Sequence, residues 1–188
     1  MDSISVENLT KKYEHFTLDK LSLKVPTGSV VGLVGANGAG KTTLIKLLLG
    51  IIKKDSGNIN IINKEDIGIV LDDAFLPELL KINDINKIMK NVYKNWDEQA
   101  FQEYLKKFNL TNNMIIKSLS KGMKKKLEIA TSLSHKPKLL ILDEPTSGLD
   151  PIVRGEVLDL FREFMESDDH SILISSHITS DLENIADY

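Results

Sequence analysis

The sequence predicts an α/β fold in which helices cover a mostly parallel sheet, joined by a short antiparallel β part and an inserted helical lobe. Three observations predict this class. Almost continuously apolar runs, typical of parallel strands covered on both faces, occupy residues 30–34, 67–70, 139–142 and 172–174. Alternating apolar and polar residues, typical of half-buried antiparallel strands, occupy residues 4–9, 18–25 and 58–62. Helical periodicity without a strand pattern fills residues 73–134.

The chain is expected to form one domain over residues 1–188. Residues 1–72 and 135–188 are expected to form the core, which begins with the antiparallel β part, and residues 73–134 the helical lobe. A chain of 188 residues is long enough to bury one substantial core. The final helix is expected to reach Tyr188 with no glycine, proline or basic residue to close it, so we expect the full-length protein to continue beyond this residue.

Helix starts are predicted from side chains that can accept a hydrogen bond from the first free backbone amides. Asn83 and Asn95 are expected to begin two helices of the lobe, and a third follows Ser120. Asp150 followed by Pro151 is a further start signal, because proline suits the first position of a helix.

The composition excludes several classes of function. The net charge of −3 and the isoelectric point near 5.8 provide no basic field, so nucleic acid is not an expected partner. The absence of cysteine excludes disulfides and thiolate metal sites and fits a reducing compartment. No apolar run is long enough for a membrane helix or a secretory leader, so we expect a cytoplasmic location.

A glycine-rich stretch follows the apolar run at residues 30–34 and precedes an apolar helical pattern. Residues 35–42 read Gly-Ala-Asn-Gly-Ala-Gly-Lys-Thr, which has the G-x-x-x-x-G-K-S/T spacing of a phosphate-binding P-loop. Glycines let the backbone curl so that its N–H groups face an anion at the start of the next helix. The alternative, a glycine turn before an ordinary helix, does not explain this spacing between a strand and a helix. We therefore expect a P-loop NTPase core.

The P-loop predicts binding of ATP with Mg²⁺. Lys41 would reach the β- and γ-phosphates and take part in catalysis, the Thr42 hydroxyl would ligate Mg²⁺, and Thr43 would hold the α-phosphate side. Contacts with the nucleotide are expected from Gly35, Asn37, Gly38, Ala39, Gly40, Lys41, Thr42 and Thr43.

Two carboxylates follow the apolar run at residues 139–142. Asp143 and Glu144 stand at the carboxyl end of a buried strand, where ligands bind in parallel α/β sheets. Asp143 would hold Mg²⁺, directly or through water, and Glu144 would polarise the water that attacks the γ-phosphate. The alternative is a solvated strand end, which the neighbouring P-loop disfavours.

Four further segments resemble motifs of the ABC ATPases. Residues 119–123 resemble the LSGGQ signature, and residues 145–150 resemble the D-loop. Residues 175–177 resemble the segment of the switch histidine, and Tyr13 resembles the aromatic residue that stacks on adenine. Together with the P-loop and the paired acids, these motifs follow the order of the family and cover the whole chain. The chain therefore resembles the ATP-binding subunits of ABC transporters, most closely the subgroup that serves bacterial ABC-2-type exporters.

This resemblance implies a head-to-tail dimer of ABC ATPases, homo- or heteromeric, with ATP held between the P-loop of one chain and the signature of the other. Ser120 and Gly122 would bind the partner's nucleotide, with Asp150 of the D-loop beside it. A helix capped by Ser120 also presents free amides and the positive end of its dipole to an anion. Lys121 and residues 124–126 crowd this turn, as expected if an anion arrives there; a merely solvated lysine run is the alternative.

The resemblance also assigns roles to single side chains. His177 would bond the γ-phosphate and link it to Glu144. Tyr13 would stack on adenine, the alternative being ordinary loop packing with Phe16 as the substitute.

Two departures from the family pattern stand out. The signature has Lys121 in place of a glycine and Met123 in place of glutamine. The Q-loop glutamine should follow residues 67–71, where the chain has Asp72 and Asp73. We place Asp72 there as a Mg²⁺ ligand. The alternative is that Asp72 only bonds the loop backbone.

We expect a Mg²⁺-dependent ATPase that powers a separate integral-membrane permease from the inner face of the cell membrane, coupled through the helical lobe. A soluble ABC-type ATPase acting as a mechanical clamp on nucleic acid or the ribosome is the alternative. Those relatives carry long coiled-coil, zinc or tandem-domain insertions, none of which occurs in this sequence. A small-molecule P-loop kinase would have no use for the signature at residues 119–123.

Overall fold

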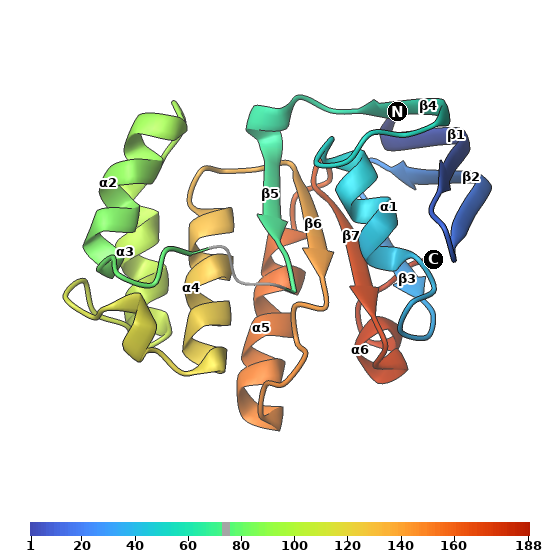
Figure 1. Cartoon of the computed structure of the whole chain (residues 1–188). Helices are drawn as coiled ribbons and strands as arrows, with labels where there is room; N and C mark the ends of the chain where they lie inside the picture. Colours follow the sequence, from blue (N-terminus) through green and yellow to red (C-terminus); the bar gives the residue numbers. More distant parts are fainter. Residues whose placement is uncertain (73–75) are drawn as a thin grey trace.

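The protein is an α/β structure with two sheets, as the sequence predicts (Figure 1). The computed structural model describes residues 1–72 and 76–188. Residues 73–75, where the predicted helical lobe begins, lie outside the described residues.

A parallel sheet of four strands forms the centre of the molecule. In spatial order its strands are β3 (Val30–Val34), β7 (Ser171–Ser176), β6 (Leu139–Asp143) and β5 (Ile67–Val70). In the register of the sheet, Val30 pairs with Ile172, which in turn pairs with Leu140. All four strands therefore end at the same edge, where the loops that follow them meet.

An antiparallel sheet lies beside the first. Its spatial order is β2 (Thr17–Pro26), β1 (Asp2–Lys12) and β4 (Ser56–Ile61). The strands are longer than the alternation in the sequence predicts, because the pairing of β1 with β2, although interrupted by register shifts, extends as far as the pairs of Asp2 with Pro26 and Lys12 with Thr17.

The parallel sheet is buried on both faces, which explains its continuously apolar strands. On one face, residues such as Val31 and Ile141 pack with helix α1 (Lys41–Leu48) and with the antiparallel sheet. On the other face, residues such as Leu140 and Ile172 pack with helix α5 (Pro151–Phe164) and the helices between β5 and β6.

The segment between β5 and β6 is helical throughout its regular elements. It contains α2 (Ile82–Val92), α3 (Glu98–Lys107), a 3₁₀ turn (Ile116–Ser118) and α4 (Lys121–Leu133). In Figure 1, α2 and α3 form the side of the molecule farthest from β1 and β2.

The predicted capping residues of α2 and α3 are each wrong by two residues. Asn83 lies inside α2, which begins after Lys81; the Lys81 amide donates to the Asp84 carboxylate at 3.1 Å. Asp97, not Asn95, caps α3, and its carboxylate accepts a 2.9 Å hydrogen bond from the Ala100 amide. At α3 the Asp97 carboxylate makes the bond predicted for Asn95, whereas at α2 the Asp84 carboxylate accepts a hydrogen bond from the amide of the capping residue itself.

The last predicted helix is also shorter than expected. Helix α6 (Thr179–Glu183) ends before the chain does, and the final residues lie beside β3. There Asp187 N donates to Val30 O and Gly32 N donates to Tyr188 O, each at 2.9 Å. Edge-strand pairing therefore replaces the last helical turn. Among the helices of residues 1–72 and 76–188, none is long and apolar enough to cross a membrane.

Candidate functional site

The loops after the parallel strands enclose a pocket of about 390 Å³. Its lining combines the glycine-rich loop, one aromatic ring and two acids: Phe16, Asn37, Gly38, Ala39, Gly40, Lys41, Thr42, Thr43, Asp72 and Glu144. The loop connects β3 to α1, so backbone amides at the start of α1 face the pocket. Gly40 has a φ of 99°, and a Cβ there would lie 2.6 Å from Phe16 Cζ. Both the backbone conformation and the ring therefore require glycine at this position.

The Lys41 ammonium lies in the mouth of the glycine-rich loop. It donates hydrogen bonds to the Gly35 carbonyl at 2.5 Å and to the Ala36 carbonyl at 3.3 Å. Its Nζ is also 3.8 Å from Glu144 Oε1. The loop thus holds a cation against an acid that comes from a different strand.

Oxygen donors converge where β6 ends. Thr42 Oγ1 donates to Asp143 Oδ2 at 2.8 Å, and Ser175 Oγ donates to Asp143 Oδ1 at 2.5 Å. Asp143 is only 1% exposed, so these hydroxyls fix the orientation of its carboxylate. The Asp72 carboxylate comes from the neighbouring strand β5 and lines the same pocket.

This donor set fits Mg²⁺. The hydroxyl and carboxylate groups are hard oxygen ligands, and Mg²⁺ is usually held by one or two carboxylates together with water and phosphate oxygens. In the described part of the chain, no group of three or more His, Cys, Asp or Glu side chains could hold a metal alone. A hydroxyl and carboxylates of this kind leave coordination positions that water and phosphate oxygens can fill.

Glu144 stands in an unusual backbone conformation. Its φ of 49° lies in the left-handed region, which is uncommon outside glycine and often marks functional sites. The Glu144 amide donates to Ser175 O at 3.1 Å, which ties this turn to β7. The residue is 8% exposed, and Oε2 lies 2.6 Å from His177 Nδ1. The turn thus directs the carboxylate between Lys41 and His177.

The aromatic residue that lines the pocket is Phe16. Tyr13 is 47% exposed and does not line it; its ring centroid lies 6.5 Å from that of Phe16. The Lys11 ammonium lies 5.5 Å from the Tyr13 ring centroid. Phe16, predicted only as the substitute for Tyr13, is thus the ring at the glycine-rich loop, and no pattern in the sequence separates the two rings.

Ser120, Gly122 and Asp150 lie outside this pocket. Ser120 caps α4, its Oγ accepting a 3.2 Å hydrogen bond from the Met123 amide, and Asp150 caps α5 with two 3.1 Å bonds. A Cβ at Gly122 would lie 3.5 Å from a methyl group of Leu149. The signature-like segment and the D-loop-like segment are therefore neighbours on a second part of the surface.

Three of the four lysines near the start of α4 have partners within the chain. Lys124 pairs with Glu78 and Lys126 with Glu156, each at 2.9 Å, and Lys125 Nζ donates to the Leu71 carbonyl at 2.6 Å. These three are neither a solvated run nor free to receive an incoming anion.

Ser175 was not among the predicted site residues, although its hydroxyl donates a hydrogen bond to Asp143 and accepts one from the Glu144 amide. A signal exists, because Ser175 is the register partner of Asp143 in the parallel sheet. Ser175 can be predicted to lie beside Asp143 only when it is known that β6 and β7 are neighbours in the sheet.

The comparisons with known proteins agree with this geometry. A family model described as ABC transporter matches residues 18–147. The chain is 38% identical over 195 residues to the lantibiotic transport ATP-binding protein SrtF of Streptococcus pyogenes, covering 98% of this chain and 84% of the relative. It is 38% identical over 201 residues to the bacitracin transport ATP-binding protein BcrA of Bacillus licheniformis, covering 98% of this chain and 65% of that one. A solved structure of an ATP binding subunit of an ABC transporter superposes with a TM-score of 0.89 at 28% identity, covering 98% of this chain and 83% of that chain.

Proposed function

Because this chain belongs to the ABC transporter family and is an ATP-binding subunit, we propose that it hydrolyses Mg²⁺-bound ATP and thereby drives a separate membrane permease. The observation that carries the proposal is the convergence of Lys41, Glu144 and His177 beside the glycine-rich loop.

In this proposal the loop amides and Lys41 hold the phosphates, and Phe16 covers the loop at Gly40. Glu144 orients the attacking water and accepts its proton. His177 supports this role, since its Nδ1 contacts Glu144 Oε2 at 2.6 Å and its amide lies 3.3 Å from the same oxygen. Tyr13, whose ring centroid lies 6.5 Å from that of Phe16, would stack on adenine beside it.

Mg²⁺ bound with the nucleotide would neutralise phosphate charge during the transfer. Thr42 and Asp143 are the residues we assign to hold it, and Asp72 is assigned to face it from β5. Asp72 adds a negative charge to the pocket, so ATP without the metal should bind poorly. An Asp72→Gln variant should therefore show a shallower dependence of ATP affinity on Mg²⁺, and parallel titration curves would remove Asp72 from the metal site.

We further propose that the working form is a dimer, in which Ser120 and Gly122 of one chain close over the nucleotide of the other and Asp150 lies beside it. This assignment is supported by the exposed, capped start of α4, whose Ser120 and Gly122 are not among the residues that line the pocket. The amides at a helix start provide a second phosphate site that the chain cannot apply to its own pocket.

The partner proposed for this dimer is an integral-membrane permease, with the ATPase bound to the inner face of the cell membrane. Two relatives are named for the transport of a lantibiotic and of bacitracin, both of which are peptide antibiotics. On that ground we propose a peptide antibiotic as the cargo class. Loss of resistance to such a peptide on deletion of the gene, and its return with the intact gene but not with Glu144→Gln, is the expected result.

The experiment that tests the proposed function is a comparison of ATP turnover with and without the permease. The full-length protein and the permease that copurifies with it should turn over ATP faster in lipid vesicles than the isolated subunit does. Stimulation by RNA, DNA or ribosomes, with none by the permease, would instead favour the mechanical-clamp alternative.

A further inference from the structure

Lys125 is buried in α4, with 3% of its surface exposed, which is rare for lysine. Its ammonium donates a 2.6 Å hydrogen bond to the carbonyl of Leu71, the residue that follows β5. The next residue is Asp72, which lines the nucleotide pocket. A side chain of α4 therefore holds the main chain at the point where it enters that pocket.

Glu128 supplies the charge partner of this lysine. Its Oε2 lies 3.2 Å from Lys125 Nζ, and the residue is 9% exposed. Neither Glu128 oxygen has a hydrogen bond of good geometry among the described residues, so the contact is one of charge. Burial raises the pKa of Glu128, the Lys125 ammonium opposes this shift, and the Asp72 carboxylate adds to it. The charges of Lys125, Glu128 and Asp72 therefore interact where α4 contacts the end of β5.

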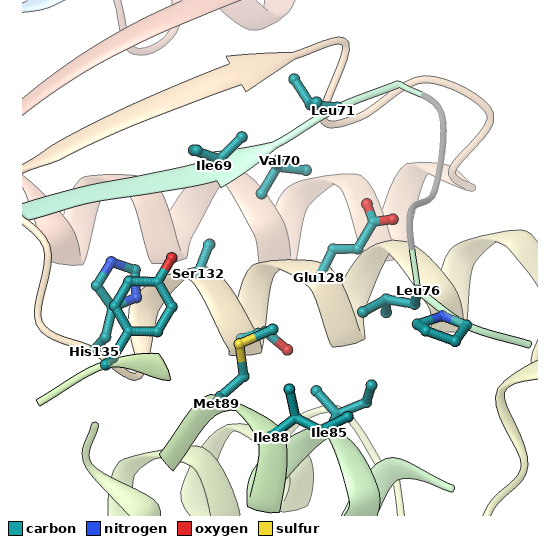
Figure 2. A pocket seen from close by; sticks show the side chains of 13 residues that line it. Ile69, Val70, Leu71, Leu76, Ile85, Ile88, Met89, Glu128, Ser132 and His135 are labelled. Carbon is teal, nitrogen blue, oxygen red and sulfur yellow. The ribbon is translucent and has the colours of Figure 1, made fainter. Parts of the chain in front are cut away.

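Figure 2 shows where this contact lies. The Glu128 carboxylate points from α4 toward the end of β5, where Leu71 is found, and it forms one wall of an apolar pocket of about 370 Å³. Ile85 and Met89 of α2 form the opposite wall. Leu71 lines this pocket as well, so the carbonyl that Lys125 holds belongs to a residue packed between β5 and the helical segment.

Helix α4 connects this contact to the signature-like segment. Ser120 caps the helix, and Lys125 lies five residues later, about 7.5 Å along the axis at the rise of an α-helix. Because a single helix carries both residues, a movement of Ser120 also moves the group that holds Leu71.

We propose that Lys125 is a positioning residue that couples the two nucleotide sites of the dimer. Through its bond to Leu71 it positions Asp72 in the nucleotide site of its own chain. Through α4 it moves together with Ser120, which binds the nucleotide in the partner's site. This inference rests on the proposed dimer and on Asp72 facing Mg²⁺. When the signature of one chain closes on the partner's nucleotide, the position of Asp72 relative to Mg²⁺ in the first chain's own site then changes.

The test removes the buried pair without leaving a lone charge. The variant Lys125→Met/Glu128→Gln keeps the approximate shape of both side chains. Lys124→Met is the matched control, because it removes the same charge one residue earlier, where the lysine pairs with the surface residue Glu78. Thermal melting of each variant shows that it is folded.

The first readout is the ratio of ATP affinity with Mg²⁺ to ATP affinity without it, measured by nucleotide binding to the monomer. The ratio should fall about tenfold in the double variant, as in Asp72→Gln, because the group that orients a metal ligand typically contributes this much. It should be unchanged in Lys124→Met. The second readout is the dissociation constant of the ATP-driven dimer, which should rise in the double variant although Ser120 is intact.

The contrary outcomes are distinct. If Asp72→Gln lowers the ratio and the double variant does not, Lys125 does not position Asp72, while the proposed function stands. If Asp72→Gln leaves the ratio unchanged, Asp72 does not face the metal, so Lys125 has no metal ligand to position through Leu71 and the inference fails with ATP binding intact. An unchanged dimer constant overturns the coupling. Failure of the wild-type protein to bind ATP would overturn the proposed function itself.

If the double variant does not fold, Lys125→Arg provides the test. It keeps the charge beside Glu128 but changes the reach and shape of the donor. A smaller fall in the ratio is expected, and a ratio equal to that of the wild type would overturn the inference.

Discussion

Replacing Asp181 by alanine should destabilise the protein far more than removing an exposed acid. Asp181 is 1% exposed and accepts hydrogen bonds from Thr146 Oγ1 at 2.6 Å and from Arg154 Nε at 2.5 Å, with Arg154 Nη2 as a further partner. It joins the loop after Glu144 to helices α5 and α6.

The magnitude follows from what the substitution leaves behind. Removing one partner of a buried ion pair typically costs about 3–5 kcal/mol, and an unsatisfied buried hydroxyl such as that of Thr146 costs about 1–3 kcal/mol. The Arg154 side chain is partly exposed and can turn toward water, which reduces the cost. We therefore expect Asp181→Ala to lower the free energy of unfolding by about 3 kcal/mol.

The assay is urea denaturation of the variant and of a matched control. Asp159→Ala removes an acid that pairs with Arg162 at 2.5 Å, but both of those side chains are at least half exposed. Such a pair contributes about 0–1 kcal/mol. Equal urea midpoints for the two variants, at an unchanged slope, would refute the reasoning that burial makes the Asp181 contacts important.

Three further predictions concern the site and the pH dependence. Glu144→Gln should keep ATP binding and slow hydrolysis by about 10²–10⁴-fold, and unchanged turnover with the permease would remove Glu144 from the catalytic role. Lys41→Ala should weaken ATP binding to the monomer whereas Ser120→Ala should not, and equal losses would contradict the action of Ser120 on the partner's nucleotide. Burial lowers the pKa of His135 below its ordinary 6.5, although the bond of its ring to a backbone carbonyl acts in the opposite direction. Below pH 6.5, His135 therefore binds more protons in the unfolded chain than in the folded one. The free energy of unfolding should therefore fall between about pH 7 and pH 5, and His135→Gln should flatten this decline in urea titrations; identical slopes would exclude the imidazole as its cause.

The architecture could be predicted from the sequence because a strand buried on both faces is almost continuously apolar. Residues 139–142 are apolar at every position and form β6, an inner strand that is buried throughout, while residues 30–34 form β3, the edge strand of the same sheet, which is buried at its first two positions. The glycine-rich loop could also be predicted, since each of its residue types is required either by the local backbone conformation or by contact with a phosphate. Such features depend on near neighbours in the chain.

Features that depend on distant residues were missed. The order of the strands decides that Ser175 faces Asp143, and nothing local in the sequence states that order. Lys125 reads as one of several lysines on a surface helix, and only the packing of α4 against β5 buries it. The last helix was predicted too long because the pairing of Asp187 with β3 is a contact across the whole chain.

The most direct test of the account is the association state of Glu144→Gln with and without ATP, measured by sedimentation. We expect a monomer without nucleotide and a dimer with Mg²⁺ and ATP, because in the proposed dimer each ATP is held by the P-loop of one chain and the signature of the other. Adding Ser120→Ala should weaken that dimer while the monomer still binds ATP. A protein that stays monomeric at saturating ATP, or that forms the same tight dimer without nucleotide, would contradict the central claim.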